Sequence, residues 1–230
     1  MKPASVVLVA LLLLGPAVMI PAEPPAITIG LLSKIIADVS KMAVGKTWQP
    51  AKRGDTLASG DRVKTGAKSV AIIKFLDNSL VRVRELSEVV VTGTLQGSEF
   101  SKSIDVRMGV IGFSVEKQRQ GEEFRFTSPT SVASIRGTGG AFNSTAGGDT
   151  LIILEGTVHF TNNPSNRSLD VAAGFTGISQ PNGTLFSRQS TPRERLMAQN
   201  ALSGDAQKTL EFELRDRDGN PRNLRIEYHD

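Results

Sequence analysis

Short apolar segments that alternate with polar residues fill the middle of the chain, and they constrain the fold more than any other feature. Between Trp48 and Phe175 we count about ten of them, each a few residues long, with apolar side chains at every second position. That period of two places neighbouring side chains on opposite faces of a β-strand. The 22 glycines and 11 prolines of the chain supply turns between the segments. Such a pattern predicts an all-β fold of stacked short strands, either solenoid-like or sandwich-like. No fixed-length repeat is visible, which weakens a strictly regular solenoid.

The segment before this region, residues 27–45, has two interpretations. Leu31, Leu32, Ile35, Ile36 and Val39 recur at helical spacing, which indicates one apolar face of a helix. Several of the same residues are β-branched, and β-branched residues favour strands. The pattern alone therefore leaves helix and strand open here.

The last forty residues change in character. Thr191, Pro192 and Glu194 have the spacing of a capping box, with the threonine as N-cap and proline at the first helical position. We expect a short helix from there to about Leu202. Two alternating segments, residues 210–215 and 224–228, then predict a β-hairpin with a loose loop between them.

The first residues resemble a secretory signal. Lys2 precedes an unbroken apolar run over residues 6–14, Pro16 interrupts it, and small residues follow up to Ala22. The run is shorter than the roughly 20 residues that span a bilayer, although an uncleaved N-terminal anchor is the competing interpretation. We expect a signal peptide at 1–22, a β domain at 27–185 and an appendage of helix and hairpin at 190–230. The predicted location is periplasmic or secreted.

Composition removes several classes of function. The chain has no cysteine, so disulfides, thiol catalysis and cysteine-ligated metals are excluded. The two histidines, His159 and His229, lie far apart in the sequence, which argues against a histidine-rich metal site. The formal net charge of +4 is small for 230 residues, so a nucleic-acid partner is not expected.

Two loops invite a ligand interpretation. Residues 136–141 form a glycine cluster, but Phe142 stands at the last glycine position of the dinucleotide fingerprint and strand-like sequence follows. We therefore expect a structural bend at Gly137 to Gly140. Residues 216–220 are rich in aspartate like a calcium loop, yet the glycine stands at position 4 where position 6 is required.

Three aspartates could be imagined as paired acids. Asp55, Asp61 and Asp77 each stand beside glycine, asparagine or serine. Aspartate is common in such turns because its carboxylate binds the nearby backbone. We predict a structural role for each, and we predict no catalytic, cofactor-binding or metal-ligating residue anywhere in the chain.

Taken together, several blocks of the sequence resemble the FecR domain family. The block that ends in Arg136, Gly137 and Thr138 is the most specific, and Asn78 stands where that family usually has glycine. The blocks occur in the family's order over about residues 45–175, at residues 48–65, 69–79, 109–113, 124–138, 150–158 and 171–174. The resemblance also favours a strand for residues 35–44.

The resemblance implies an all-β fold with solenoid-like stacking and no catalytic residues. In the sensor proteins of that family the domain is periplasmic and relays the state of a siderophore receptor to a cytoplasmic segment that controls a sigma factor. Only five residues precede the apolar run here. We therefore expect a stand-alone exported domain that does not itself hold a sigma factor.

The predicted function is a non-enzymatic exported module that binds a protein or a cell-envelope component, in envelope sensing or signalling. A structural scaffold of the envelope or cell surface is the alternative, and an enzyme acting on polysaccharides is the least favoured. No cofactor is expected, and neither is a membrane span after the N-terminal signal. The sequence leaves the oligomeric state and the identity of the partner open.

Overall fold

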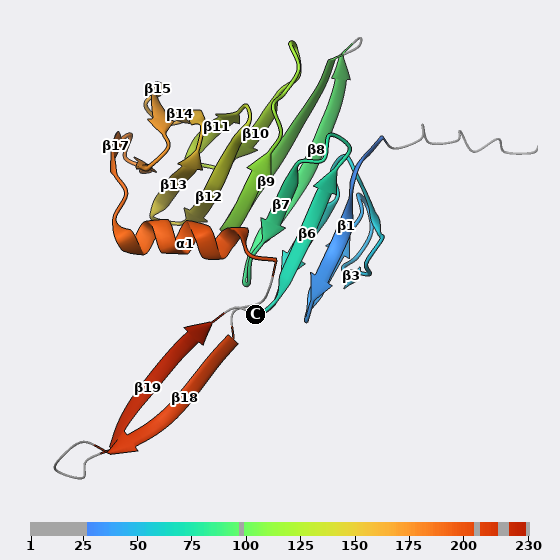
Figure 1. Cartoon of the computed structure of the whole chain (residues 1–230). Coiled ribbons are helices and arrows are strands. Elements are labelled where there is room, and N and C mark those ends of the chain that lie inside the picture. Colours follow the sequence, from blue (N-terminus) through green and yellow to red (C-terminus); the bar gives the residue numbers. More distant parts are fainter. Residues whose placement is uncertain (1–26, 97–98, 205–207, 216–220, 229–230) are drawn as a thin grey trace, which may run out of the picture.

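The computed structural model describes residues 27–96, 99–204, 208–215 and 221–228, with backbone only for the last two strands. A sheet of 17 strands folds into two facing layers, joined through the long strand β9 (Figure 1). The predicted all-β class, with one short C-terminal helix and a terminal hairpin, is confirmed.

One layer carries the helix, and we call it the helix layer. Its strands are antiparallel neighbours throughout. In spatial order they are β4 (Thr56–Ala58), β1 (Thr28–Ile36), β6 (Val70–Phe75), β7 (Leu80–Val83), the second half of β9 (Glu99–Val115), β12 (Thr138–Thr145), β13 (Gly148–Glu155), β16 (Phe175–Ser179) and β17 (Leu185–Gln189).

The other layer has no helix on its outer side within the described residues, and we call it the bare layer. All its pairs are antiparallel except β9 with β10, which run parallel. In spatial order its strands are β3 (Gln49–Pro50), β2 (Val39–Met42), β5 (Arg62–Thr65), β8 (Glu88–Gln96), the first half of β9, β10 (Phe124–Thr127), β11 (Ser131–Ile135), β14 (Thr157–Asn162) and β15 (Arg167–Ala172).

The chain passes repeatedly from one layer to the other, and each described crossing includes a residue in the left-handed region. At Gly109, in the middle of β9, φ is +96° and an added Cβ would lie 2.2 Å from the hydroxyl oxygen of Ser87. Glycine is required there because a side chain would meet both strain and a clash. The residues with positive φ at the crossings are Ala37, Gly54, Gly60, Lys68, Leu86, Gly109, Gly121, Gly137, Gly156 and Gly174.

The core lies between the two layers. Successive phenylalanine rings from both layers touch along its length, with centroid distances from 4.7 to 6.4 Å. Such edge-on and tilted contacts add to the apolar area that the rings bury. The six rings belong to Phe75, Phe113, Phe124, Phe126, Phe142 and Phe160, all at most 2 % exposed.

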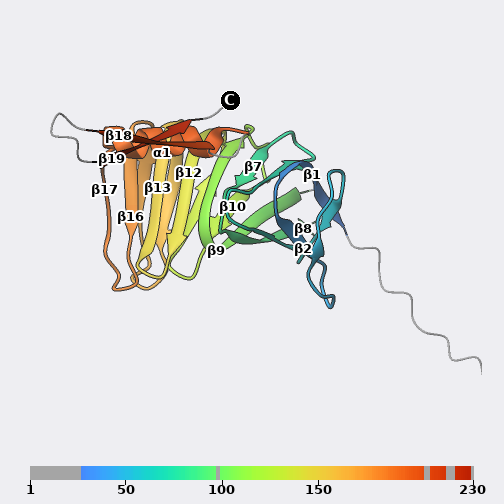
Figure 2. The ribbon, with the colours of Figure 1, turned by 90° about the horizontal axis from the view of Figure 1, so that it is seen from below.

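The helix α1 (Pro192–Leu202) lies across β9, β12 and β13 on the outer side of the helix layer (Figure 2). The predicted capping box is confirmed: the Glu194 amide donates to the Thr191 hydroxyl and the Glu194 carboxylate accepts from the Thr191 amide. Ala198 and Ala201 are the buried residues of α1. They pack with Ala141 and Ile152 of the sheet. The helix also approaches β9 so closely that an added Cβ at Gly112 would be 2.0 Å from the Ala201 carbonyl oxygen.

Residues 27–45 form strands β1 and β2, so the strand interpretation that the resemblance favoured is confirmed and the helical alternative was wrong. The alternating segments 104–108 and 111–115 belong to one long strand, β9, which bends between the layers at Gly109. The bend expected at Gly137 to Gly140 is confined to Gly137, because Thr138–Thr145 is strand β12.

The predicted hairpin is present as β18 (Lys208–Arg215) and β19 (Pro221–Tyr228), paired antiparallel. It forms a separate two-stranded sheet with no hydrogen-bonded neighbour among the other described strands. The signal segment and the loop at residues 216–220 lie outside the described residues. Within the described part of the chain, no helix is long and apolar enough to cross a membrane.

Candidate protein-binding face

The strands of the bare layer are in register, so their outward residues line up in rows across the sheet. We call the two central rows, on β8, β9, β10, β11, β14 and β15, the bare face. The first row contains Thr92, Ser103, Arg125, Ser134, His159 and Asp170. The second row contains Val90, Asp105, Thr127, Val132, Thr161 and Ser168.

The alternation of each strand makes these residues point outward. Their chain neighbours Val91, Ile104, Phe126, Ala133 and Phe160 are fully buried between the layers. The period of two therefore leaves the residues of the rows on the solvent side. All of them are half-buried or exposed, and most carry a hydroxyl or a charge.

Polar side chains of the bare face bind one another across neighbouring strands. The His159 Nδ1 and Asp170 Oδ1 atoms are 2.8 Å apart, and the hydroxyls of Thr161 and Ser168 are 2.9 Å apart. Arg125 of the first row pairs with Glu123, which directly precedes β10. The face is therefore rich in hydrogen-bonding groups.

Asp105 lies between Val90 and Thr127 in the second row, where its charge is partly desolvated. Burial raises the pKa of this carboxyl, and the Arg107 guanidinium, 2.8 Å away, opposes the rise. A carboxylate held with a raised pKa is a good acceptor for a cation or an N–H donor that would restore its lost solvation.

A shallow hollow of about 290 Å³ lies over β8, β9 and β10. Thr92, Ser101, Ser103, Arg125 and Thr127 line it. Its size and its hydroxyl groups suit a protruding polar side chain of a partner. Non-obligate protein interfaces are polar and wet in this manner, with about ten direct hydrogen bonds each.

The predicted turn roles of the aspartates are supported. Asp55 accepts the Lys52 amide, and Asp61 accepts the Ala58 amide. Asp77 accepts the Ser79 amide. Within the described part of the chain, none of these three carboxylates is hydrogen-bonded to another of them.

Asp77 also ties two parts of the chain together at the rim of the layers. Its Oδ2 accepts from Lys102 Nζ at 2.5 Å and from Gln118 Nε2 at 2.9 Å. Burial pushes the pKa of this carboxyl upward, but the hydrogen bonds from Lys102, Gln118 and Ser79 hold it below its usual value.

The other residues singled out in the sequence are also placed. His159 lies in β14 and belongs to the bare face. Gly137 forms a crossing between the layers, and a strand follows it rather than the helix that a phosphate cradle requires. His229 and the aspartate-rich loop at residues 216–220 lie outside the described residues. Among the residues that the structure describes, no group of three or more metal-ligating side chains is found.

Sequence reasoning missed a buried carboxylate, Asp149. Its Oδ2 accepts the hydroxyls of Ser128 and Ser131, while the Ser128 hydroxyl oxygen accepts the amides of Thr130 and Ser131. The aspartate, 1 % exposed, thereby fixes the turn between β10 and β11. The closely spaced serines at 128 and 131 are the signal in the sequence, because buried hydroxyls need an acceptor.

Residues 61–159 match the model of a family described as FecR protein. The FecR resemblance is confirmed. The matched segment supplies β5 to β13 completely, which includes four of the six strands of the bare face, and it ends within a fifth, β14. No curated protein matches the chain.

Two crystal structures of a candidate anti-sigma factor from Parabacteroides distasonis ATCC 8503 have a similar fold. The structure at 2.50 Å resolution shares 9% identity and a TM-score of 0.50, over 59% of this chain and 62% of that chain. The structure at 1.65 Å resolution shares 10% identity and a TM-score of 0.51, over 69% and 70%. At such low identity, the likeness shows a common fold.

Proposed function

We propose that this chain is an exported FecR-domain protein that binds another protein or an envelope component through the bare face, in envelope sensing or signalling. The observation that carries the proposal is the position of the bare face. Most of its residues belong to the FecR-matched segment, and no described element covers it. Its rows of hydroxyl and charged groups would bind a polar partner.

Two further observations support this function. FecR-type domains in sensor proteins are periplasmic, and residues 1–22 have the composition of an export signal. The two similar crystal structures are described as a candidate anti-sigma factor, which favours a protein partner and a regulatory role. The function proposed here involves no chemical step.

The proposal is tested by filling the bare face with one bulky side chain. Ser134 is exposed at the centre of the first row, so Ser134→Trp blocks contact there without entering the core. The matched control is Ser187→Trp, which alters an exposed serine on β17 in the helix layer. Both variants and the wild type are returned to cells that lack the gene, and transcription of envelope genes is measured.

We expect the deletion to change transcription, the control to restore it, and Ser134→Trp to fail although it is exported and folded. Full restoration by Ser134→Trp would contradict the proposed face. A deletion that weakens the envelope without any transcriptional response would favour the scaffold role instead.

A further inference from the structure

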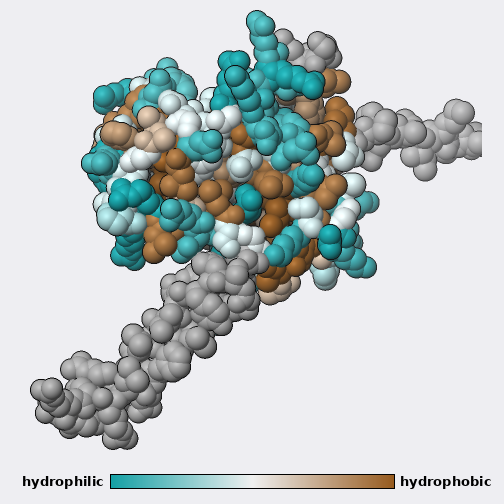
Figure 3. All heavy atoms as spheres, in the orientation of Figure 1, coloured by the Kyte–Doolittle hydropathy of each residue, from teal (hydrophilic) through white to brown (hydrophobic). Residues whose placement is uncertain are grey.

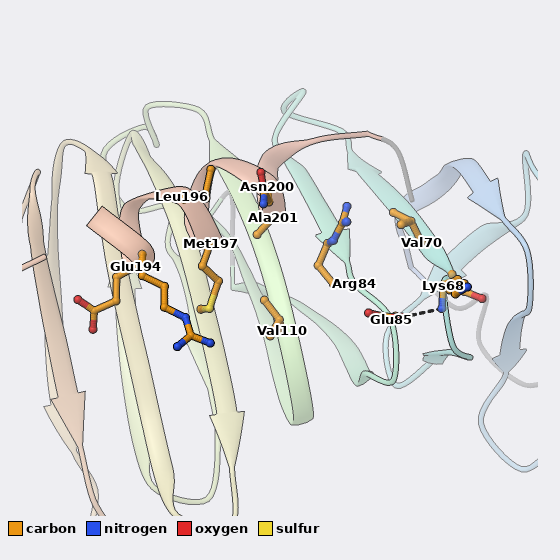
Figure 4. Close-up of a pocket in the computed structure, with 12 residues that line it drawn as sticks. Lys68, Val70, Arg84, Glu85, Val110, Glu194, Leu196, Met197, Asn200 and Ala201 are labelled. Atoms are coloured by element: carbon orange, nitrogen blue, oxygen red, sulfur yellow. Dashed lines mark hydrogen bonds between the residues drawn. The ribbon is translucent and has the colours of Figure 1, made fainter. Parts of the chain in front are cut away.

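The outer side of the helix layer carries an apolar groove beside α1. It has a volume of about 540 Å³ and lies between α1 and the ends of β6, β7 and β9. Val70 and Val110 form its floor, and Leu196 and Met197 of α1 border it (Figure 4). Leu196 is 56% exposed, so a large apolar side chain stands at the mouth of the groove without cover.

The surface around this groove is unlike the bare face. Apolar side chains gather beside α1 on this side of the molecule (Figure 3). The rim of the groove holds the Glu85 carboxylate, which accepts the Lys68 amide at 2.6 Å (Figure 4). An apolar floor with a polar rim is the arrangement found at the centre of protein interfaces.

The terminal hairpin, which we call the arm, has an apolar face of its own. Its register places Leu210 opposite Ile226 and Phe212 opposite Leu224. These four residues therefore share one face of the two-stranded sheet, and charged residues alternate with them on the other. A lone hairpin is at best marginally stable in water, so this face needs a surface to cover it.

The arm leaves the body of the chain at the same rim as the groove. Arg84 Nη1 donates to the Ser203 carbonyl oxygen at 3.0 Å, and an added Cβ at Gly204 would lie 3.5 Å from Ile72 Cδ1. Three residues, 205–207, then join Gly204 to the arm, a reach of about 10 Å when extended. Figure 1 shows β18 and β19 extending past the rim, away from α1 and the helix layer.

We propose that the protein forms a symmetric dimer in which the arm of each copy lies in the α1 groove of the other. A two-fold arrangement covers both apolar surfaces of both copies at once, and it closes without leaving a further groove or arm exposed. Because β18 extends away from α1 (Figure 1), docking within one chain would instead require the three joining residues to turn the arm back. The dimer leaves both bare faces free, so a dimer would offer a partner two equivalent sites.

Sedimentation of the exported protein tests the dimer. We expect the wild type to be a dimer that dissociates on dilution. Leu196→Glu in the groove and Leu224→Glu in the arm should each weaken self-association at least tenfold. The matched control is Leu76→Glu at the far end of β6, where Leu76 is 71% exposed, and this variant should remain a dimer. Circular dichroism confirms that each variant is folded.

A mixture of two variants tests whether the arm of one copy binds the groove of the other. A purely structural role of Leu196 or Leu224 within one chain would not be restored by mixing. Leu196→Glu and Leu224→Lys are each monomeric if the proposal is correct. Mixed, they should form a heterodimer, because one groove then pairs glutamate with lysine and the other retains both leucines.

A monomeric wild type would overturn the proposal. It would also be overturned if the wild type and both single variants were all dimers. Failure of the mixture to associate would overturn it as well. None of these results depends on the bare face, because Ser134→Trp leaves the groove and the arm intact.

Discussion

Strand β9 passes through both layers, and its two halves show how differently the layers meet their surroundings. In the bare layer its outward residues include Ser101, Ser103 and Asp105; in the helix layer they are Val110, Gly112 and Ser114. Inward residues are equally buried in both halves. The outward-facing residues of the strands, and not the core residues, therefore decide which layer a helix can cover.

The helix layer has the small and apolar outward residues that close packing requires. Ala141 and Ile152 contact Ala198 and Ala201 of α1 in a second, smaller apolar cluster. The bare layer has hydroxyls and charges at the equivalent places, so it gains little from permanent cover and remains available to a partner. The following predictions sharpen this comparison, from the largest expected effect to the smallest.

Removal of the C-terminal region should have the largest effect. We propose that residues 27–185 form a domain that folds alone and that residues 190–230 are an appendage. Truncation after Gln189 should leave a core that melts cooperatively, but at a lower temperature and with more binding of a hydrophobic dye, because Ala141 and Ile152 lose their cover.

The matched control is truncation after Gly204, which removes the arm and keeps α1. It should melt above the longer truncation, because Ala141 and Ile152 keep their cover. Complete loss of structure after the longer truncation would show instead that α1 belongs to the core and that the proposed boundary is wrong.

Valine at two outward positions of β9 compares the layers within one strand. Gly112→Val should destabilise the protein by about 1–3 kcal/mol, because its side chain would enter the backbone of α1 at Ala201. Ser103→Val, in the bare layer, should stay within about 0.5 kcal/mol of the wild type. Denaturant unfolding measures both. Equal losses in the two variants would mean that the bare layer is also covered.

Much of the fold could be predicted from local patterns, because each strand carries its own alternation and α1 its own capping box. The structure of segment 27–45 could not be predicted from its local pattern. A β-bulge between Leu32 and Lys34 and the left-handed corner at Ala37 each shift the alternation by one residue. The shifted pattern of Leu31, Leu32, Ile35 and Ile36 then has the spacing of a helix.

The bare face could not be predicted because its rows are not local. Thr92 and Asp170 lie in one row only through five strand pairings, one of them the parallel pair of β9 with β10. The register of these pairings cannot be read from a single sequence. Likewise, Gly109 indicates a break in the strand pattern, but nothing beside it shows whether the chain ends a strand or turns a corner.

Acid should change the stability contributed by one carboxylate beside α1 and by one in the bare layer in opposite directions. The Arg188 guanidinium, hydrogen-bonded to Glu194 beside α1, lowers the pKa of that carboxyl to about 2. A lowered pKa means that Glu194 contributes stability above its usual pKa of 4.5 and loses it as the pH falls toward 2. The difference in melting temperature between wild type and Glu194→Gln should therefore shrink over that range.

Asp105 in the bare layer should behave in the opposite way. Burial raises its pKa above 3.8, so its ionised form is disfavoured in the folded protein, and the folded state gains relative stability as the pH falls. Asp105→Asn should melt above the wild type at pH 7 and lose that advantage in acid. A destabilised Asp105→Asn at pH 7 would show that the charge is compensated.

Photo-crosslinking in the native envelope tests most directly whether the bare face, and not the helix side, meets the partner. A photoreactive residue replaces Ser134 or Ser168 on the bare face, or Gln199, which is exposed on α1. We predict one common adduct from positions 134 and 168, lost when Arg125→Glu is added, and no such adduct from position 199. An adduct from position 199 alone, or the same adduct from all three positions, would contradict the account.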